Sequence, residues 1–152
     1  MSVPPHETER RIRELTAALR AENLRLTHQR LEVVREIAQT DKHPDVESVY
    51  RGVRARMPTI SLDTVYRTLA TLAHRGLVNR VGTIAGPVRY DANVTRHHHF
   101  VCSRCGMVRD VTDPALDAVR APSGTSALGA VESVEVQLRG ICKECATRGD
   151  GT

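Results

Sequence analysis

Apolar residues in the first half of the chain recur at every third or fourth position, which is the period of an amphipathic helix. Ile12, Leu15 and Leu19 predict one helix over roughly residues 7–21. Three further stripes predict three more helices: Leu31, Val34, Ile37 and Ala38; then Val46, Val49, Tyr50, Val53 and Met57; then Val65, Leu69, Leu72 and Ala73. The pattern therefore predicts four helices within about the first 75 residues.

Residues that start and stop helices lie where these stripes begin and end. Thr27, Asp45 and Ser61 each precede a stripe, and their side-chain oxygens can accept hydrogen bonds from the first free N–H groups of a helix. Pro58 stops the third helix and Gly76 the fourth. The last two helices, joined by a three-residue turn, have the dimensions of a helix-turn-helix, whose second helix lies in the DNA major groove.

The fourth helix carries short polar groups, an arginine and an aromatic residue opposite its apolar stripe: Thr64, Arg67, Thr71 and His74, with Tyr66 at the margin. Hydroxyl and guanidinium groups can reach bases and phosphates at close approach, whereas a merely solvated face more often carries Glu and Lys. Two short runs, Val78–Val81 and Val88–Tyr90, are separated by glycines and predict a hairpin, the wing of a winged helix. A plain helical interaction module is the alternative.

Charge is distributed unevenly along the chain, whose net charge is +4. Residues 1–90 carry 15 Lys and Arg against 10 Asp and Glu, while residues 91–152 carry 7 against 8. Such an excess alone is more often a solvated surface, and it supports DNA binding here because a reading helix lies within it. Arg25, Arg30, Arg51 and Arg54 are candidates for phosphate contacts, or only surface charge. The expected DNA-binding residues are Arg30, Ser61, Thr64, Tyr66, Arg67 and Thr71.

The second half changes to the two-residue period of strands. Val134, Val136 and Leu138 alternate with polar residues and predict a strand within residues 131–138 that has one buried face. Other strands are expected at His99–Cys102 and Val108–Val111, and a short helix at Pro114–Val119. The predicted fold class is α+β: a winged-helix domain over residues 1–90, a hinge over 91–96, and a small α/β domain over 97–152 that is stabilised by zinc.

Zinc enters because all four cysteines form two Cys-x-x-Cys pairs, Cys102/Cys105 and Cys142/Cys145, which can supply four thiolates to one tetrahedral ion. Disulfides are the alternative, but the chain is charged almost from its start, which argues against a secretory leader and favours a reducing cytoplasm. A redox role would leave the second pair unexplained. With 3% aromatic residues, the core is aliphatic and needs support from metal or dimerisation. No apolar run reaches membrane-spanning length.

Histidines precede the first cysteine pair. On a strand, His97 and His99 project to one face, while His98 and Cys102 project to the other, so two separate metals are expected. Two neighbouring histidines alone are more often exposed surface residues than metal ligands. Further potential ligands elsewhere in the chain, Asp91, Asp110 and His43, favour a metal site that includes this histidine pair.

Seven segments, taken in order, resemble the ferric uptake regulator (Fur) family: Leu26-Thr27-His28-Gln29-Arg30, His43-Pro44, Ser61-Leu62-Asp63-Thr64-Val65-Tyr66-Arg67-Thr68-Leu69, Gly76-Leu77-Val78, Arg89-Tyr90-Asp91, His97-His98-His99-Phe100-Val101-Cys102-Ser103-Arg104-Cys105-Gly106 and Gly140-Ile141-Cys142-Lys143-Glu144-Cys145. The resemblance implies a homodimeric, metal-dependent transcriptional repressor that binds a palindromic double-stranded DNA operator, with residues 97–152 as its dimerisation and metal-binding domain. It also implies a regulatory metal between the two domains. The ligands carried over from the peroxide-sensing branch are His43, Asp91, His97, His99 and Asp110.

This ligand set of imidazoles and carboxylates suits Fe(II) or Mn(II) and leaves zinc to the thiolates. In the peroxide branch, oxidation of ligand histidines, here His43 and His97, ends repression. Asp110 favours that branch, because iron-sensing members often place Glu there. An iron-responsive repressor of iron uptake is the alternative. The family's further metal site is expected to be absent, because its positions hold Arg96, His98 and Val134.

A zinc-dependent hydrolase is the remaining alternative. It needs a general-base carboxylate and an open coordination position, and the sequence contains no His-Glu-x-x-His or His-x-Glu pattern. We therefore predict that the chain is not an enzyme and that it has neither a small organic substrate nor a membrane partner.

Overall fold

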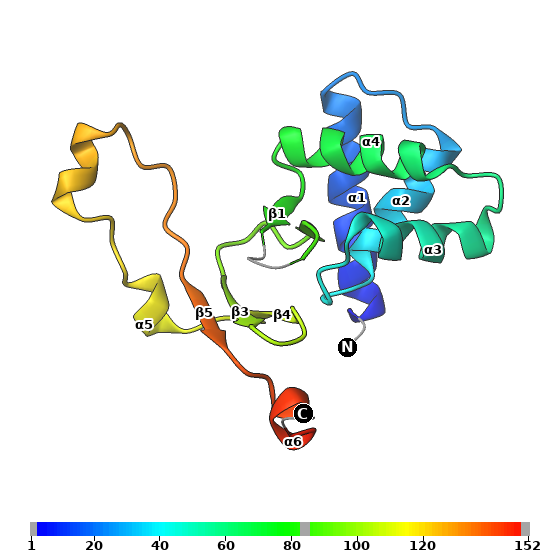
Figure 1. Ribbon diagram of the computed structural model, residues 1–152. Helices are drawn as coiled ribbons and strands as arrows, with labels where there is room; N and C mark the ends of the chain where they lie inside the picture. The colour runs from blue at the N-terminus through cyan, green and yellow to red at the C-terminus, as the bar shows by residue number, and fades with distance from the viewer. Residues whose placement is uncertain (1–2, 83–85, 150–152) are drawn as a thin grey trace. The chain divides into compact units, whose positions relative to one another are not determined.

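The computed structural model describes residues 3–82 and 86–149 and divides into two compact units, Met1–Val94 and Thr95–Thr152. Helices and one hairpin build the first unit, and a three-stranded sheet forms the centre of the second (Figure 1). The predicted α+β class, with a winged helix followed by a small sheet domain, is confirmed.

The helices described in the first unit are α1 Pro5–Ala21, α2 His28–Ala38, α3 Val46–Arg56 and α4 Leu62–His74. The three predicted caps are confirmed, since Thr27, Asp45 and Ser61 each accept a hydrogen bond from the backbone N–H three residues ahead. Helix α1 starts two residues earlier than predicted, because Pro5 fits the first turn, where its missing N–H costs nothing.

The predicted apolar stripes meet in one core. The helices contribute ten side chains that are at most 5% exposed: Leu15, Leu19, Val33, Val34, Ile37, Val49, Val53, Val65, Leu69 and Leu72. Each of the four helices contributes, and α3 packs against both α2 and α4. This core fixes α4 within its unit and leaves the polar side of that helix toward solvent.

The predicted hairpin is confirmed as β1 Asn79–Val81 paired antiparallel with β2 Arg89–Asp91. The tip between the strands, residues 83–85, lies outside the described residues. Asp91, which the sequence places in the hinge, is the last residue of β2, where it pairs with Asn79.

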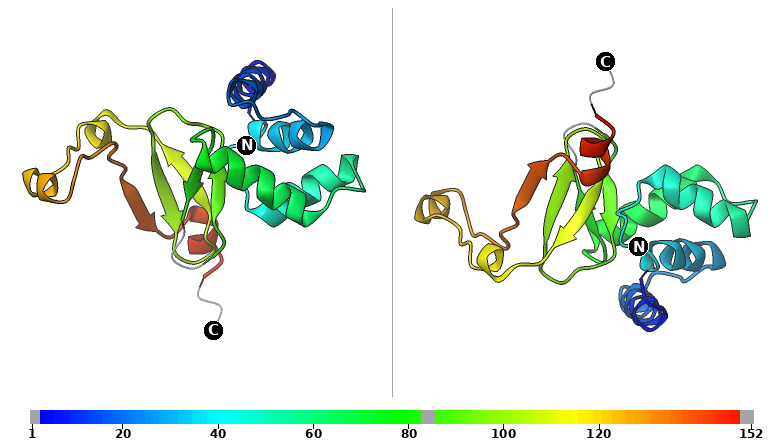
Figure 2. Two further views of the ribbon diagram at one scale, coloured as in Figure 1. Left: turned by 90° about the horizontal axis from the view of Figure 1, so that it is seen from above. Right: turned by 90° about the horizontal axis from the view of Figure 1, so that it is seen from below.

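The sheet of the second unit has the order β4-β3-β5 (Figure 2). Strand β3, His98–Cys102, pairs antiparallel with β4, Val108–Val111, and parallel with β5, Gln137–Gly140. Short helices α5 Pro114–Asp117 and α6 Lys143–Thr147 and a 3-10 helix at Ser123–Ala127 complete the unit. The segment with α5 and the 3-10 helix extends away from the sheet (Figures 1 and 2).

The prediction for residues 131–138 is wrong in two respects. The strand begins only at Gln137, and Leu138 is 40% exposed. Pairing with β3 explains the position, because the register between the two strands starts at His99 opposite Gln137. The alternating apolar positions are therefore only partly buried within this chain, with Val134 and Val136 half-buried and Leu138 exposed.

Within the described residues, no helix combines the length and apolar character needed to cross a lipid bilayer.

Candidate metal centres

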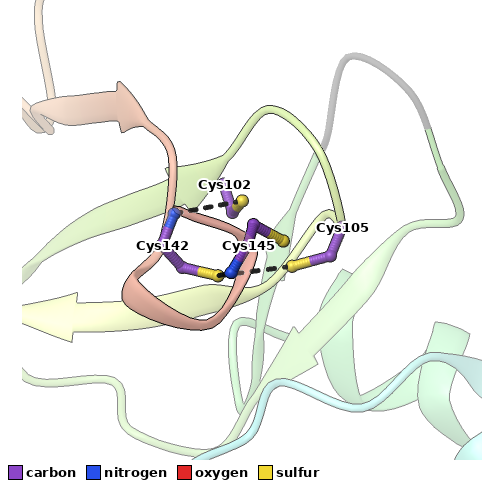
Figure 3. Close-up of side chains that lie close together, drawn as sticks. All are labelled: Cys102, Cys105, Cys142 and Cys145. Carbon is purple, nitrogen blue, oxygen red and sulfur yellow. Dashed lines mark hydrogen bonds between the residues drawn. The ribbon is translucent and has the colours of Figure 1, made fainter. Parts of the chain in front are cut away.

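The four cysteines converge in the second unit, as the sequence predicts (Figure 3). Cys102 ends β3, Cys105 lies in the following turn, Cys142 follows β5, and Cys145 lies in α6. Their sulfur atoms all lie within 4.8 Å of one another. Strand pairing between β3 and β5 therefore brings the two Cys-x-x-Cys pairs to one point.

The spacing of the sulfurs fits a metal rather than a disulfide. Sγ of Cys105 and Sγ of Cys142 are 3.8 Å apart. A zinc–sulfur bond of about 2.3 Å gives a tetrahedron whose edge is about 3.8 Å, whereas a disulfide requires sulfurs about 2.05 Å apart. All four thiols are free. The cluster thus has the dimensions of a four-thiolate tetrahedral site.

Hydrogen bonds within the cluster change the pKa values of two of its thiols. Backbone N–H groups of Cys105 and Cys142 donate to Cys102 and lower the pKa of its thiol to about 6. Hydrogen bonds with Cys142 and Cys105 raise the pKa of Cys145 to about 12. Hydrogen bonding therefore favours the anion at Cys102 and the proton at Cys145, and binding of a metal releases the protons that remain.

A second group of potential ligands lies in the same unit on β3 and β4. His97 immediately precedes β3, and strand pairing places His99 opposite Asp110. The two imidazole Nε2 atoms are 3.0 Å apart, and Oδ1 of Asp110 lies 3.2 Å from Nε2 of His97 and 3.6 Å from Nε2 of His99. As the strand period predicts, both histidines lie on one face.

The orientation of His97 is set by the backbone. Its Nδ1 lies 2.6 Å from the carbonyl oxygen of Thr95, so Nδ1 carries the proton and donates it to that oxygen. Nε2 then presents its lone pair toward His99 and Asp110. Nitrogen lone pairs and a carboxylate oxygen that converge in this way need a proton or a cation among them, and a divalent metal fits this donor set.

The first unit holds a buried pair of its own. His43, in the loop between α2 and α3, is 1% exposed, and Asp91 at the end of β2 is 3% exposed. Nε2 of His43 lies 3.1 Å from Oδ2 of Asp91. The other carboxylate oxygen, Oδ1, accepts the backbone N–H of Asn93 at 2.8 Å, which fixes the plane of the carboxylate. Each unit therefore carries a preformed part of the expected regulatory ligand set.

The residues expected to contact DNA divide into two groups. Tyr66 is 55% exposed on α4, and Arg67 is exposed beside Asp63, with which it forms an ion pair. The hydroxyls of Ser61, Thr64 and Thr71 form hydrogen bonds within α4 and its cap, and Arg30 donates to the carbonyl of Arg25. Tyr66 and Arg67 are thus the side chains that α4 most clearly offers to a partner.

One buried contact escaped prediction. His98 is fully buried, and its Nδ1 accepts the backbone N–H of Val136 at 3.0 Å. Its Nε2 lies 3.1 Å from Oδ1 of Asp117 in α5. The sequence gives no signal for Asp117, because 19 residues separate it from His98.

The sequence profile of the ferric uptake regulator family matches residues 21–138. The chain belongs to this family. The peroxide-responsive repressor PerR of Staphylococcus epidermidis is 28% identical over 150 residues, covering 99% of this chain and 100% of that protein. The family's regulators are not enzymes, and neither is this chain.

Solved structures agree with the fold. The ferric uptake regulator of Helicobacter pylori has a TM-score of 0.73 at 23% identity, over 91% of this chain and 93% of that one. The peroxide stress regulator of Campylobacter jejuni has a TM-score of 0.66 at 28% identity, over 86% and 94% of the two chains.

Proposed function

We propose that this family member is a homodimeric, metal-dependent repressor that senses peroxide through a regulatory Fe(II). The observation that carries the proposal is the pair of preformed ligand clusters, His43 with Asp91 in the first unit and His97, His99 and Asp110 in the second. A single ion that binds both clusters would tie the DNA-reading unit to the dimerisation unit.

Ligands from both units explain how a metal can act as a signal. A metal shifts a population of conformations only by its differential affinity, and a change from mostly open to mostly closed requires roughly 5 kcal/mol. An open form loses one of the two clusters and therefore much of that affinity. Three imidazoles and two carboxylates suit Fe(II) or Mn(II).

The closed form presents two α4 helices to successive half-sites of a palindrome. The side chains proposed to contact DNA are Arg30, Ser61, Thr64, Tyr66, Arg67 and Thr71. Tyr66 and Arg67 support this role most directly, because both are exposed, Arg67 on the side of α4 opposite the buried Val65 and Leu69 and Tyr66 at the margin of that side. Net positive charge in residues 1–90 favours approach to phosphates.

The second unit is proposed to hold structural zinc at Cys102, Cys105, Cys142 and Cys145 and to form the dimer. Support for zinc comes from the sulfur spacing. Support for dimerisation comes from large apolar side chains that the unit leaves exposed: Val119, Leu128, Val131, Leu138 and Ile141. A second copy of the chain can cover these residues.

Iron supplies the oxidising chemistry when bound, and the chain supplies the groups that record it. The imidazoles of His43 and His97 are the proposed targets. One oxygen atom of peroxide is added to the ring and the other leaves as water. An oxidised ring is a poorer ligand, so metal is lost and repression ends. Mn(II) gives a repressor that peroxide does not inactivate.

A decisive test compares the Mn and Fe forms of the zinc-loaded protein on a duplex operator selected from random sequences. After micromolar peroxide, the Fe form should release DNA, and mass spectrometry should find one added oxygen on the His43 or His97 peptide. The Mn form and the exposed His74 peptide serve as controls. Retention of DNA by the Fe form, with neither peptide oxidised, would leave the iron-responsive repressor as the function.

The ligand assignment has its own test. Replacement of His43 or Asp110 by Ala should abolish metal-stimulated DNA binding while zinc content stays near one ion per chain. Loss of zinc in these variants would contradict two separate sites.

A further inference from the structure

The backbone of His43 is in an unusual conformation. Its φ is +52°, in the left-handed region that bulky side chains rarely adopt, and its side chain is fully buried. A residue persists in this region only when surrounding contacts hold it there, and such residues are concentrated at functional sites. The contacts around His43 therefore bear on how its imidazole is presented.

Strand β2 supplies contacts on one side of the loop that carries His43. Nη1 of Arg89 donates to the carbonyl oxygen of His43 at 3.1 Å. The backbone N–H of Tyr90 donates to the carbonyl of Pro44 at 3.0 Å, and Asp45 forms an isolated antiparallel bridge with Arg89. The strand thus holds three consecutive residues, His43 to Asp45, up to the point where Asp45 caps α3.

The N-terminal part of the chain holds the beginning of the same loop. Nη1 of Arg11, which is 8% exposed, donates to Oδ1 of Asp41 at 3.1 Å. The backbone N–H of Val3 donates to the carbonyl of Gln39 at 3.1 Å. Residues 39–45 are therefore fixed at both ends, and Arg89 acts on the backbone of His43 itself.

Strand geometry connects Arg89 with the second buried ligand. Residues two apart on a strand project to the same face, so Arg89 and Asp91 share a side of β2. The same short strand therefore supplies Asp91 and the guanidinium that fixes the backbone of its partner, His43. From this geometry we propose that Arg89 is a positioning residue of the regulatory site, which orders the imidazole of His43 against Asp91 before metal arrives. The inference rests on the proposed regulatory metal.

Electrostatics and positioning make opposite predictions for Arg89. A guanidinium near a cation site repels the cation, so Coulomb's law alone predicts that removing it tightens metal binding. A positioning role predicts weaker binding, because partners that orient a ligand typically contribute roughly tenfold to a hundredfold to metal affinity. The sign of the change therefore separates the two.

The experiment measures Mn(II) affinity by electron paramagnetic resonance on the full-length, zinc-loaded protein. Arg89→Met should weaken Mn(II) binding by roughly tenfold to a hundredfold. Arg89→Lys should fall between Arg89→Met and the unaltered chain, because an ammonium can donate to the His43 carbonyl but lacks the planar fork. Arg80→Met, which removes an exposed arginine from the partner strand β1, should bind Mn(II) as tightly as the unaltered chain or slightly more tightly.

Zinc content and helical circular dichroism check that each variant is folded. If Arg89→Met fails this check, Arg89→Lys decides alone: weaker Mn(II) binding supports the proposal, and unchanged or tighter binding overturns it. If the unaltered chain and Arg89→Met bind equally tightly, while His43→Ala does not bind, only the positioning role is wrong. If the unaltered, zinc-loaded chain does not bind Mn(II), the proposed function itself is wrong.

Discussion

The two units of this chain are stabilised in different ways. In the first, side chains from four helices close around one aliphatic core that includes the fully buried Val33, Ile37 and Leu69. In the second, the buried apolar side chains of the described residues are few, chiefly Val101 and Val108 beside two of the cysteines. The comparison indicates that the apolar core is enough to stabilise the helical unit. The sheet unit has a smaller core and is expected to need stabilisation from outside that core.

Exposed side chains point to the same contrast. Of the eight large hydrophobic residues that are exposed in the described part of the chain, five belong to the smaller, second unit. A contiguous exposed apolar patch usually marks a contact with another protein, and dimerisation is the contact proposed for this unit. The sheet unit is thus expected to need both a metal ion and a second copy of the chain.

Removing zinc should give the largest effect and should be confined to the second unit. Structural zinc contributes on the order of 10 kcal/mol to the folding of small metal-binding domains. We expect Cys142→Ser, or chelation under reducing conditions, to collapse the amide dispersion of residues 95–149 in NMR spectra while residues 3–82 keep theirs. Ser103→Ala, in the turn between Cys102 and Cys105, is the control. A sheet that stays folded without zinc would remove the basis of the comparison.

The stability of the helical unit should fall when a cavity is made in its core and should not depend on metal. Leu69 is fully buried in α4, and Leu→Ala at such positions costs about 2–5 kcal/mol. Leu69→Ala should lower the urea midpoint of the helical signal and leave zinc content unchanged. Leu62→Ala, on the exposed side of the same helix, should change stability by no more than about 0.5 kcal/mol. Equal losses in both variants would argue against the assigned core.

A smaller effect is expected at the ion pairs between α2 and α3. Glu32 is 6% exposed and accepts hydrogen bonds from Arg56 at 2.9 Å and Arg35 at 2.8 Å. The bond from Arg56 is the main cause that lowers the pKa of Glu32 below its ordinary 4.5. Because the folded-state pKa is the lower one, this stabilisation is complete above about pH 4.5 and disappears as the pH falls through the folded value.

Glu32→Gln should therefore lower the free energy of unfolding by about 1–2 kcal/mol at pH 7 and flatten its decline below pH 4.5. Urea titrations of the helical signal between pH 3 and 7 measure both quantities. Glu47→Gln, at an exposed ion pair on α3, is the matched control. A variant whose stability falls with acid as steeply as that of the unaltered chain would show that another carboxylate causes the decline.

Substitution of Leu138 is expected to have the smallest effect on stability. Its effect on dimerisation is expected to be large. Because this side chain is 40% exposed in one chain, Leu138→Glu should change the folding of the chain by only about 0.5 kcal/mol. The charge should nevertheless prevent dimerisation if β5 lies in the interface. Sedimentation as a function of concentration tests this, and zinc content reports the integrity of the sheet. A variant that remains dimeric would place the interface elsewhere.

Local features of the fold could be predicted from the sequence. Thr27, Asp45 and Ser61 act on N–H groups three residues away, so their capping is visible in the sequence alone. The common face of His97 and His99 follows from the two-residue period of a strand. The four helices could likewise be predicted from their own apolar stripes, without reference to the elements that they pack against.

Features that depend on distant partners were predicted less well. The start of β5 is set by its register with β3, so the alternation that ends at Leu138 placed the strand too early. In the candidate site, Arg89 reaches the carbonyl of His43 across 46 positions, and no local pattern signals that contact. The cysteine ligands were proposed from their spacing and the regulatory ligands from a family resemblance, whereas the groups that orient the proposed ligands required the fold.

Parallel pairing of β3 and β5 has a consequence for the order of folding. Cys102 lies opposite Gly140, so this contact spans 38 residues, and non-local contacts of this kind form slowly because the intervening chain must first be ordered. During synthesis the helical unit is complete before β5 and Cys142 have been made. A nascent chain should therefore complete its helical unit first, and the proposed zinc site can close only after β5 and Cys142 have been added.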